Sequence, residues 1–450
     1  MDNRRRALLP SRRYSSKNMI QVSDVKSVTS DQSWFNNPLS FLLQLFSLST
    51  NAHRDKNFNS CLSLIRMIIT GVGFGVLQLL DLYYKIGHVY SGLSVSVRLT
   101  DSVQTIYDYF QYTVDLFYVY KYGRHFYQEY YKQYNTIDQI LRAGSCNAIR
   151  KKITKLVILF VSIWLITSVM DFIAWVLIYG WTIPTVFSLA YNYLLLKILT
   201  NLDLTYQTMH IEVRLQVISG LMQSYYTCCD SLPGGPGKKC GDPVQNKNWL
   251  YSHFSVPPKD SLKWSAKSRR HGIRWLTRCY LLLKEQSAFI NQMFGVRVLL
   301  NSLSLLIDMV RFSNLAIRLV MGLQQDGNGT KVTKYIVNGV KRNMHDWEYF
   351  TAISTVCRLL VCAVILTNLV HHCELVYRQT DRIISISDHL LINKNPDPDL
   401  REAVTELRDL VQSRPIDFHM ANFIRLDYSM LMSTASIVVT YTIILLQSLN

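Results

Sequence analysis

Long apolar stretches recur along this sequence, and each is close to the length that a helix needs to cross a membrane. Residues 153–179, for example, read ITKLVILFVSIWLITSVMDFIAWVLIY, and a membrane-spanning helix needs about 20 residues. Only 18% of the residues are charged, against about 25% in soluble domains. We therefore predict an all-α, polytopic membrane protein. The seven predicted spans are residues 60–82, 100–120, 153–179, 182–200, 293–321, 350–373 and 426–447.

The N-terminal arm is not predicted to add a further span. Residues 38–49 are too short to cross a membrane and are predicted to form an interfacial or re-entrant helix. The arginines at positions 4–6, 12 and 13 are followed by no apolar core, so we expect no cleavable signal peptide. Residues 100–120 fit a span least well, because their three aspartates, Asp101, Asp108 and Asp115, would be costly against lipid.

Basic residues alternate between rich and poor segments. The N-terminal arm and the loops after the second, fourth and sixth predicted spans are rich in Lys and Arg, and the other loops are poor. Cytoplasmic loops of membrane proteins collect these residues. We therefore predict a cytoplasmic N-terminus and an extracellular C-terminus. Orientation then accounts for the net charge of +17, and a nucleic-acid partner is not expected.

Two further features bear on this orientation. The sequon Asn328-Gly329-Thr330 falls in the loop between the fifth and sixth predicted spans, which this topology places outside, so Asn328 is a predicted glycosylation site. A G-protein-coupled receptor has the opposite orientation, and its Asp/Glu-Arg-Tyr and Asn-Pro-x-x-Tyr motifs are missing from the third and seventh predicted spans. A carrier would be expected to show repeats or broken spans. Both classes remain alternatives.

Helices are also predicted to extend into the cytoplasm. Apolar residues recur at helical spacing in residues 202–226 and 269–290, whereas residues 229–262 contain Gly and Pro clusters and are predicted to be a disordered loop. Packed across subunits, these helices would form an assembly domain; the alternative is amphipathic helices lying on lipid. The predicted organisation is an N-terminal arm with the interfacial helix, 1–59; spans one to four, 60–200; cytoplasmic helices, 201–290; spans five and six, 291–375; a cytoplasmic segment, 376–425; and a last helix, 426–450.

The C-terminal sequence carries a family resemblance. Thr440 and Tyr441, then five mostly apolar residues, then Gln447 resemble the signature that closes the insect gustatory receptor family. Residues 418–430 resemble that family's approach to its last helix, and residues 291–295 resemble the start of its fifth span. The resemblance covers nearly the whole chain, although the specific motif is short.

This resemblance implies a tetrameric, ligand-gated cation channel, homomeric or assembled with related subunits, in which four last helices line the pore. An amide ring can coordinate a partly hydrated cation and an apolar ring can close a pore by dewetting. Helix packing is an equal alternative for the Thr-Tyr pair. Many members place Phe after the Gln, and Ser448 stands there in this chain, which leaves the identity of the gate open. The predicted pore and gate residues are Thr440, Tyr441, Ile443, Leu446 and Gln447.

Polar groups at membrane depth usually face a cavity or a partner. Carboxylates and amides suit the hydroxyls of a sugar, whereas aromatic faces suit bitter compounds, and the sequence does not choose between them. Asp171 stands alone among apolar neighbours, with a buried structural hydrogen bond as its alternative role. Asp308 and Arg311, three residues apart, could instead pair with each other. The predicted ligand-binding residues are Gln104, Tyr107, Asp171, Trp175, Asp308, Trp347 and Thr351.

Motifs for catalysis, cofactors or metals are not found in the sequence. There is no Gly-rich phosphate loop, no Ser/His/Asp pattern and no CxxC pair among the nine cysteines, and His371, His372 and Glu374 lack further ligands. We therefore do not expect an enzyme. The resemblance to insect gustatory receptors implies instead a taste receptor in the plasma membrane of a sensory neuron, in contact with lipid. A small tastant would open it to Na⁺, K⁺ and Ca²⁺. A co-receptor subunit that binds no ligand is an alternative within the same family.

Overall fold

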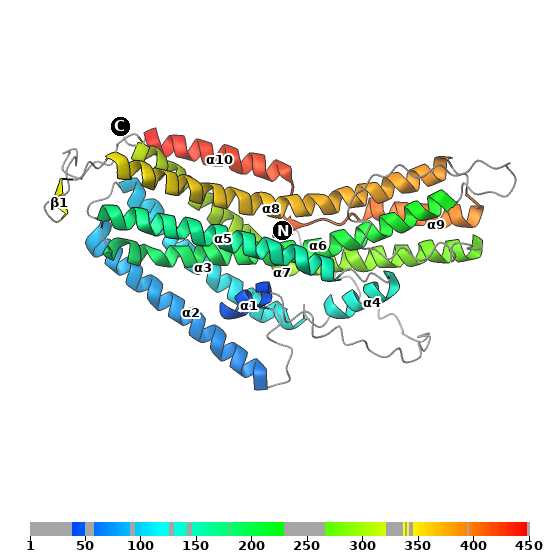
Figure 1. The fold of residues 1–450 in the computed structure, drawn as a ribbon. Coiled ribbons are helices and arrows are strands. Elements are labelled where there is room, and N and C mark those ends of the chain that lie inside the picture. Colours follow the sequence, from blue (N-terminus) through cyan, green and yellow to red (C-terminus); the bar gives the residue numbers. More distant parts are fainter. Residues whose placement is uncertain are drawn as a thin grey trace, which may run out of the picture. The chain divides into compact units, whose positions relative to one another are not determined.

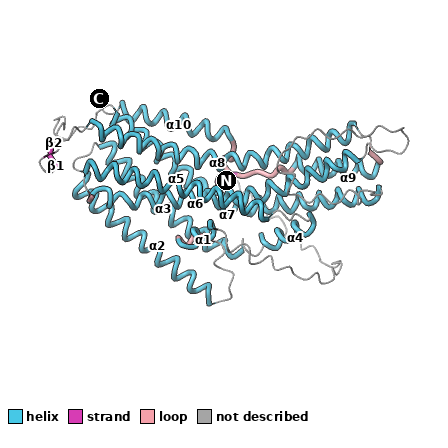
Figure 2. Tube along the Cα trace, viewed as in Figure 1, coloured by secondary structure: helices cyan, strands magenta, loops and turns pink. Residues whose placement is uncertain are grey.

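Helices make up almost all of the chain that the computed structural model describes (Figures 1 and 2), which confirms the predicted all-α class. The described residues are 38–49, 58–90, 95–125, 130–141, 146–179, 181–228, 266–320, 336–337, 340–341, 345–393 and 396–447. They belong to one unit, residues 37–450. Asn328, Ser448, the predicted loop 229–262 and residues 1–37 lie outside the described residues.

The described elements follow one another as helices with two short antiparallel hairpins, β1–β2 and β3–β4. Helix α2 continues directly into the single π-helical turn η3. The elements are α1 (Pro38–Leu45), α2 (Phe58–Tyr84), η3 (Lys85–Val89), α3 (Val95–His125), α4 (Tyr131–Leu141), α5 (Cys146–Tyr179), α6 (Thr182–Cys228), α7 (Ala266–Val320), β1 (Ile336–Val337), β2 (Val340–Lys341), α8 (His345–Asn393), α9 (Pro398–Ser413), β3 (His419–Met420), β4 (Ile424–Arg425) and α10 (Tyr428–Gln447).

Each of the seven predicted spans coincides largely with one of these helices. Five of the described helices, α2, α5, α7, α8 and α10, are long and apolar enough to cross a membrane by length and composition. Helices α3 and α6 hold the second and fourth predicted spans but do not meet that criterion, because charged and polar residues interrupt them. The number of seven spans therefore stays a prediction.

Helix α6 is the most enclosed element of the bundle. It packs against α1, α2, α3, α4, α5, α7 and α8, and nearly every side chain from Tyr191 to Leu215 is buried. A helix that is buried on every side has no water-facing side on which to place its polar residues. Its polar residues must instead find partners on the neighbouring helices, and this requirement builds the site described below.

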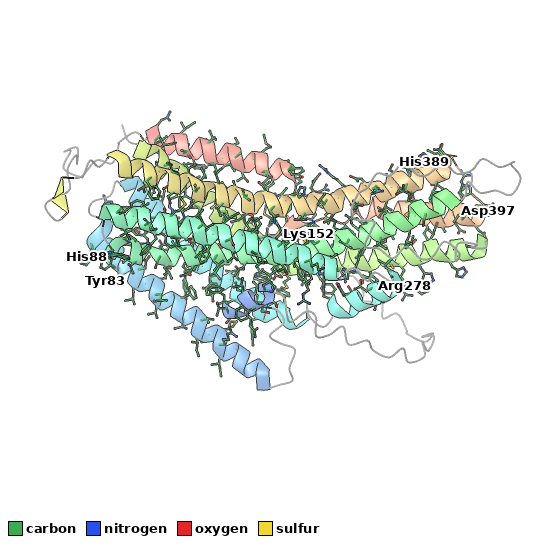
Figure 3. The ribbon with its side chains drawn as sticks, viewed as in Figure 1. Tyr83, His88, Lys152, Arg278, His389 and Asp397 are labelled. Carbon is green, nitrogen blue, oxygen red and sulfur yellow. The ribbon has the colours of Figure 1, made fainter. Side chains whose placement is uncertain are left out.

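The two ends of the bundle hold different parts of the sequence. Tyr83 and His88 lie at one end, and Arg278, His389 and Asp397 lie at the other, with Lys152 between them (Figure 3). The structure thus separates residues predicted to be outside from residues predicted to be cytoplasmic. The predicted helical continuations 202–226 and 269–290 fall within α6 and α7, which run on without a break.

The first and last described helices differ in how they are covered. The eight-residue helix α1 packs against α5 and α6, with Leu39 and Leu43 buried. Helix α10 packs against α7 and α8, and of its 20 residues only Met430 and Thr442 are buried. The last described helix is therefore apolar and packs against the bundle along one side.

Candidate functional site

The three aspartates of α3 lie on one face of that helix and point into the protein. Their spacing of seven residues is close to two helical turns, and all three side chains are buried. Each carboxylate has a cation from a later helix: Asp101 pairs with Arg311 at 2.8 Å, Asp108 with Lys197 at 2.8 Å, and Asp115 with Arg297 at 2.9 Å. The cost of these charges against lipid is thereby avoided.

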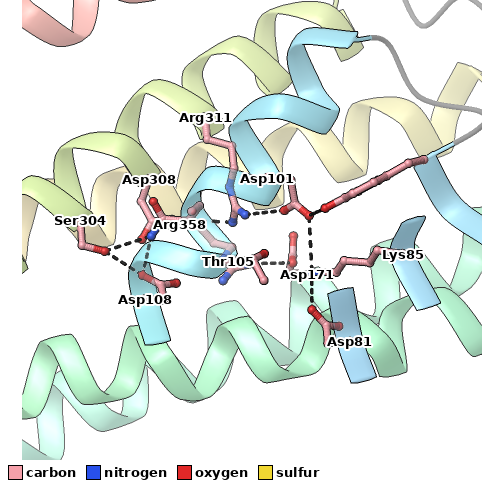
Figure 4. Close-up of polar contacts among 12 residues, drawn as sticks. Asp81, Lys85, Asp101, Thr105, Asp108, Asp171, Ser304, Asp308, Arg311 and Arg358 are labelled. Carbon is pink, nitrogen blue, oxygen red and sulfur yellow. Dashed lines mark hydrogen bonds and ion pairs between the residues drawn. The ribbon is translucent and has the colours of Figure 1, made fainter. Parts of the chain in front are cut away.

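Two of these ion pairs belong to a longer buried chain of charges (Figure 4). Lys85 bridges Asp81 at 2.7 Å and Asp101 at 3.4 Å. Asp308 lies 2.6 Å from Lys197 and 3.7 Å from Arg311. This ion chain, as we call it, joins four carboxylates and three cations from α2, η3, α3, α6 and α7. In order, its members are Asp81, Lys85, Asp101, Arg311, Asp308, Lys197 and Asp108.

Neutral side chains extend the ion chain between α3 and α7. The amide of Gln104 donates to Asp108 at 2.6 Å and to Ser304 at 3.0 Å, and the Ser304 hydroxyl donates to Asp108 at 2.8 Å. The Tyr107 hydroxyl donates to the Leu300 carbonyl at 3.2 Å. Helix α7 is therefore tied to α3 at several successive turns.

A second buried cluster surrounds Asp171 on α5. This carboxylate accepts hydrogen bonds from Tyr191 at 2.8 Å and Ser354 at 3.0 Å, and it pairs with Arg358 at 2.8 Å. The Arg358 guanidinium lies 4.9 Å from the centre of the Phe312 ring, and the Arg311 guanidinium lies at the same distance from that ring. Phe312 thus stands between the Asp171 cluster and the ion chain.

The structure brings most of the predicted ligand-binding residues into these two clusters. Gln104 and Asp308 belong to the ion chain or its hydrogen bonds, with Tyr107 beside them, and Asp171 centres the second cluster. Asp308 contacts Arg311, as the spacing allowed, but its shorter contact is with Lys197.

The remaining predicted ligand-binding residues lie on α5 and α8. Thr351 is buried on α8, where its carbonyl accepts the Thr355 hydroxyl at 2.8 Å. Trp175 is half-buried on α5, one turn beyond Asp171. Trp347 lies in the first turn of α8, and its side chain is outside the described part of the structure.

Of the cations in the site, Arg311 was singled out from the sequence as a possible partner of Asp308, and the others were not. Lys197, Arg297 and Arg358 each fall inside a predicted span, and Lys85 follows one. A charge within a span is by itself a sign of a functional or structural partner, so the signal was present in the sequence. Which aspartate each cation would meet depends on packing between helices that are distant in sequence.

Three buried acceptor atoms of the site have no hydrogen-bond partner among the described residues. They are Oε1 of Gln78, Oδ1 of Asp81 and Oε1 of Gln104. Gln78 also donates to the carbonyl of Thr105 at 2.8 Å, which places it at the α2–α3 contact beside the ion chain. Buried acceptors are usually satisfied, so this side of the site suits a guest that carries donors.

A separate polar cluster joins α4 to the C-terminal half of α6. Arg214 donates to Asp138 at 3.0 Å, and its guanidinium lies 3.7 Å from the centre of the Tyr134 ring. Burial, and secondarily the Arg214 charge, lower the pKa of His210 well below its usual 6.5. Burial raises the pKa of Asp138, and the nearby Arg214 opposes that rise. His210 is therefore neutral in the folded protein at neutral pH.

The predicted pore residues are spread around α10. Tyr441, Ile443 and Gln447 are exposed and Leu446 is half-buried. The Thr440 hydroxyl, also exposed, donates to the Ser436 carbonyl of its own helix at 2.8 Å. Neighbouring α8 contacts the start of α10 through His371, whose Nδ1 lies 3.0 Å from the Tyr428 hydroxyl oxygen. Among the described residues, no group of three His, Cys, Asp or Glu side chains could hold a metal ion.

Comparison with known proteins covers most of this chain. A family model described as "7tm Chemosensory receptor" matches residues 37–448. The insect olfactory receptor OR5 from Machilis hrabei has a similar fold, with a TM-score of 0.50 and 10% identity, covering 91% of this chain and 98% of that chain. The structure of that receptor in complex with eugenol gives a TM-score of 0.47 and 9% identity, covering 91% and 97%. No curated protein sequence matched this chain.

Proposed function

Because the chain belongs to the 7tm chemosensory receptor family, we propose that it is a taste receptor that acts as a ligand-gated, non-selective cation channel. A sugar or a bitter compound would open it in the plasma membrane of a sensory neuron. The channel would be a tetramer, of this chain alone or with related subunits, and it would pass Na⁺, K⁺ and Ca²⁺.

The observation that carries the channel proposal is the exposure of α10. This helix has no charged residue and is a candidate span, and among the described helices α7 and α8 are the ones that it mainly packs against. Apolar side chains such as Ile443 and Ile444, each about half exposed, are left to lipid or to other copies. Four copies around an axis would line a pore with such a helix. Gln447 would then form the amide ring, and Ile443 or Leu446 the apolar ring that closes by dewetting.

The proposed ligand region is the pair of polar clusters between α3, α5, α6, α7 and α8. Such groups are costly at membrane depth unless they have partners, and they commonly mark ligand or ion pathways. The partnerless acceptors of Gln78, Asp81 and Gln104 favour a ligand that brings hydroxyl or ammonium donors. On this proposal, ligand binding rearranges the clusters, α10 moves outward, and the ring near Gln447 widens.

The test is electrical. The full chain is expressed alone in oocytes under voltage clamp, with G-protein signalling blocked, while sucrose, fructose, caffeine and quinine are perfused. A compound-evoked cation current that survives the block is the expected result. A current abolished by the block would instead indicate a coupled receptor. Silence at normal surface expression, reversed by adding a related receptor subunit, would indicate the co-receptor alternative.

A pair of glutamine variants tests the pore assignment within the same experiment. Gln447→Leu is expected to change the relative permeability to Na⁺ and Ca²⁺, because it replaces the amide ring by an apolar one. Gln412→Leu is the matched control, since Gln412 is exposed on α9, away from α10. Equal permeability ratios in both variants and the wild-type channel would remove Gln447 from the pore.

A further inference from the structure

The segment that leads into α10 is a tight hairpin. Strands β3 and β4 pair antiparallel, with His419 opposite Arg425 and Met420 opposite Ile424. Ala421 and Asn422 in the turn have positive φ angles of 49° and 63°. Such angles are uncommon outside glycine, so the surrounding contacts must hold the turn in place.

Helix α7 provides one half of those contacts. The Asn291 amide bridges the strand backbone, donating to the Asp417 carbonyl at 2.8 Å and accepting from the His419 N–H at 3.1 Å. One turn later, the hairpin backbone lies directly over Gly295. A Cβ atom at that glycine would stand 3.1 Å from both the Ala421 nitrogen and the His419 carbonyl oxygen. The hairpin therefore sits on α7 at backbone distance.

Helix α8 provides the other half. The Tyr377 hydroxyl accepts the Phe418 N–H at 3.1 Å and lies 3.2 Å from the Phe418 carbonyl oxygen, to which it donates. The Arg425 guanidinium stacks 4.1 Å above the Tyr377 ring. We call Asn291, Gly295 and Tyr377 together the hairpin seat. It binds both strands and holds them between α7 and α8.

The same two helices also carry the proposed ligand region. Helix α7 runs unbroken from Ala266 to Val320 and contains both Gly295 and Asp308. Helix α8 runs unbroken from His345 to Asn393 and contains both Arg358 and Tyr377. At 1.5 Å per residue, Asp308 lies about 20 Å along the helix from Gly295. A helix without a break carries a displacement along its axis from one point to the other.

We propose that the hairpin seat is the mechanical link between the ligand region and α10: a shift of α7 against α8 moves the β3–β4 hairpin, and the hairpin moves the start of the pore helix. Asn291, Gly295 and Tyr377 are positioning residues in this scheme and touch neither ligand nor ion. The link rests on the proposed channel function, because it concerns how ligand binding opens that channel.

The test is the open probability of variants at the seat. Gly295→Ala forces the hairpin away from α7 by a few tenths of an ångström, since the new Cβ meets backbone atoms. Gly220→Ala is the matched control: Gly220 is also helical, and a Cβ there would meet nothing within 4 Å. Oocyte currents are recorded at saturating sucrose, fructose, caffeine or quinine, using whichever activates the wild-type channel. Noise analysis separates channel number, unitary current and open probability.

We expect Gly295→Ala to lower the open probability by about fivefold, with unitary current unchanged and Gly220→Ala like wild type. A purely structural role would reduce only the number of channels. Tyr377→Phe covers the case in which Gly295→Ala does not reach the surface. It removes the hydroxyl but keeps the ring, with exposed Tyr83→Phe as its control, and it should lower the open probability by about twofold.

The outcomes separate the link from the channel itself. Normal open probability in both Gly295→Ala and Tyr377→Phe, in channels that wild type shows to be active, would overturn the link and leave the channel proposal standing. Absence of current from the wild-type chain, alone or with a related subunit, would overturn the channel proposal and the link with it.

Discussion

Helices α6 and α10 differ in both burial and charge. Helix α6 is enclosed on all sides and carries Lys197, Glu212 and Arg214, all buried. Helix α10 is largely uncovered and carries no charge at all. The comparison shows that charge inside this protein is tolerated where several helices can supply partners. Apolar surface, in contrast, is left uncovered on α10 and on other candidate spans such as α2, where Leu79 and Leu80 are exposed.

The largest expected effect comes from Lys197 on α6. Lys197→Met removes the buried cation that Asp108 and Asp308 share, and leaves Asp308 with its longer contact to Arg311. We expect a loss of about 3–5 kcal/mol in the free energy of unfolding. Lys155→Met on α5, an exposed lysine, should change it by no more than about 0.5 kcal/mol. Denaturation of the purified chain in mixed micelles measures both. Equal stability of the two variants would mean that the ion chain does not hold α3, α6 and α7 together.

Asp171 should have the next largest effect. Asp171→Asn keeps the shape of the side chain but leaves the Arg358 charge without a counterion, and we expect a loss of about 1–3 kcal/mol. Exposed Asp409→Asn on α9 is the control. The same variant separates two roles of Asp171. Unchanged half-maximal concentrations of the activating compound, despite lower stability, would assign Asp171 to helix packing and not to ligand contact.

The third effect is a dependence of stability on pH, and it comes from His210 in the C-terminal half of α6. His210 has a lowered pKa in the folded chain, so below its usual pKa the unfolded chain takes up a proton that the folded chain does not. Its contribution to stability is present above pH 6.5 and is lost as the pH falls, by at most about 1.4 kcal/mol per pH unit. The raised pKa of Asp138 acts in the opposite sense, nearer its own usual value of 3.8.

The measurement is stability in micelles between about pH 7 and about pH 5. The wild-type chain should lose stability across this range, and His210→Gln should flatten the curve there. A wild-type curve that is already flat would show that His210 can take up a proton without leaving its place between Tyr134 and Arg214.

The smallest effect on stability is expected on α10. Ile443 is about half exposed in the single chain, so Ile443→Ala should cost no more than about 0.5 kcal/mol in dilute micelles. The contrast with Lys197→Met is the point of the comparison. A loss of several kcal/mol would mean that Ile443 is covered, by another copy of the chain, under the conditions of measurement.

How far the sequence predicted this molecule differs between the two helices. For α10, a continuous apolar run and a short motif were enough, because its bounds of Tyr428–Gln447 depend on local composition. For α3, composition was less informative, since three aspartates argue against the predicted span. Their seven-residue spacing indicates one buried face, but the partners Lys197, Arg297 and Arg311 come from α6 and α7. Such pairings depend on tertiary packing, which no local pattern contains.

The hairpin seat shows the same limit in another form. Residues 291–295 and residues 418–430 each stood out in the sequence, but nothing there indicated that they touch. Asn291 and His419 are 128 residues apart. The close approach of the hairpin to Gly295 depends on how α7 and α8 pack together. The same is true of the hydrogen bonds between Tyr377 and the Phe418 backbone.

The long sequence separation between the α3 aspartates and their partners also bears on the order in which the protein can fold during its synthesis. Arg297 follows Asp115 by 182 residues, and Arg311 follows Asp101 by 210. At the usual speed of translation, roughly ten seconds or more separate each acid from its cation. During that interval Asp115 lacks the cation that it pairs with in the folded chain, and Asp101 has Lys85 alone. The ribosome therefore has to complete α7 before the early half of the chain can settle in its final place.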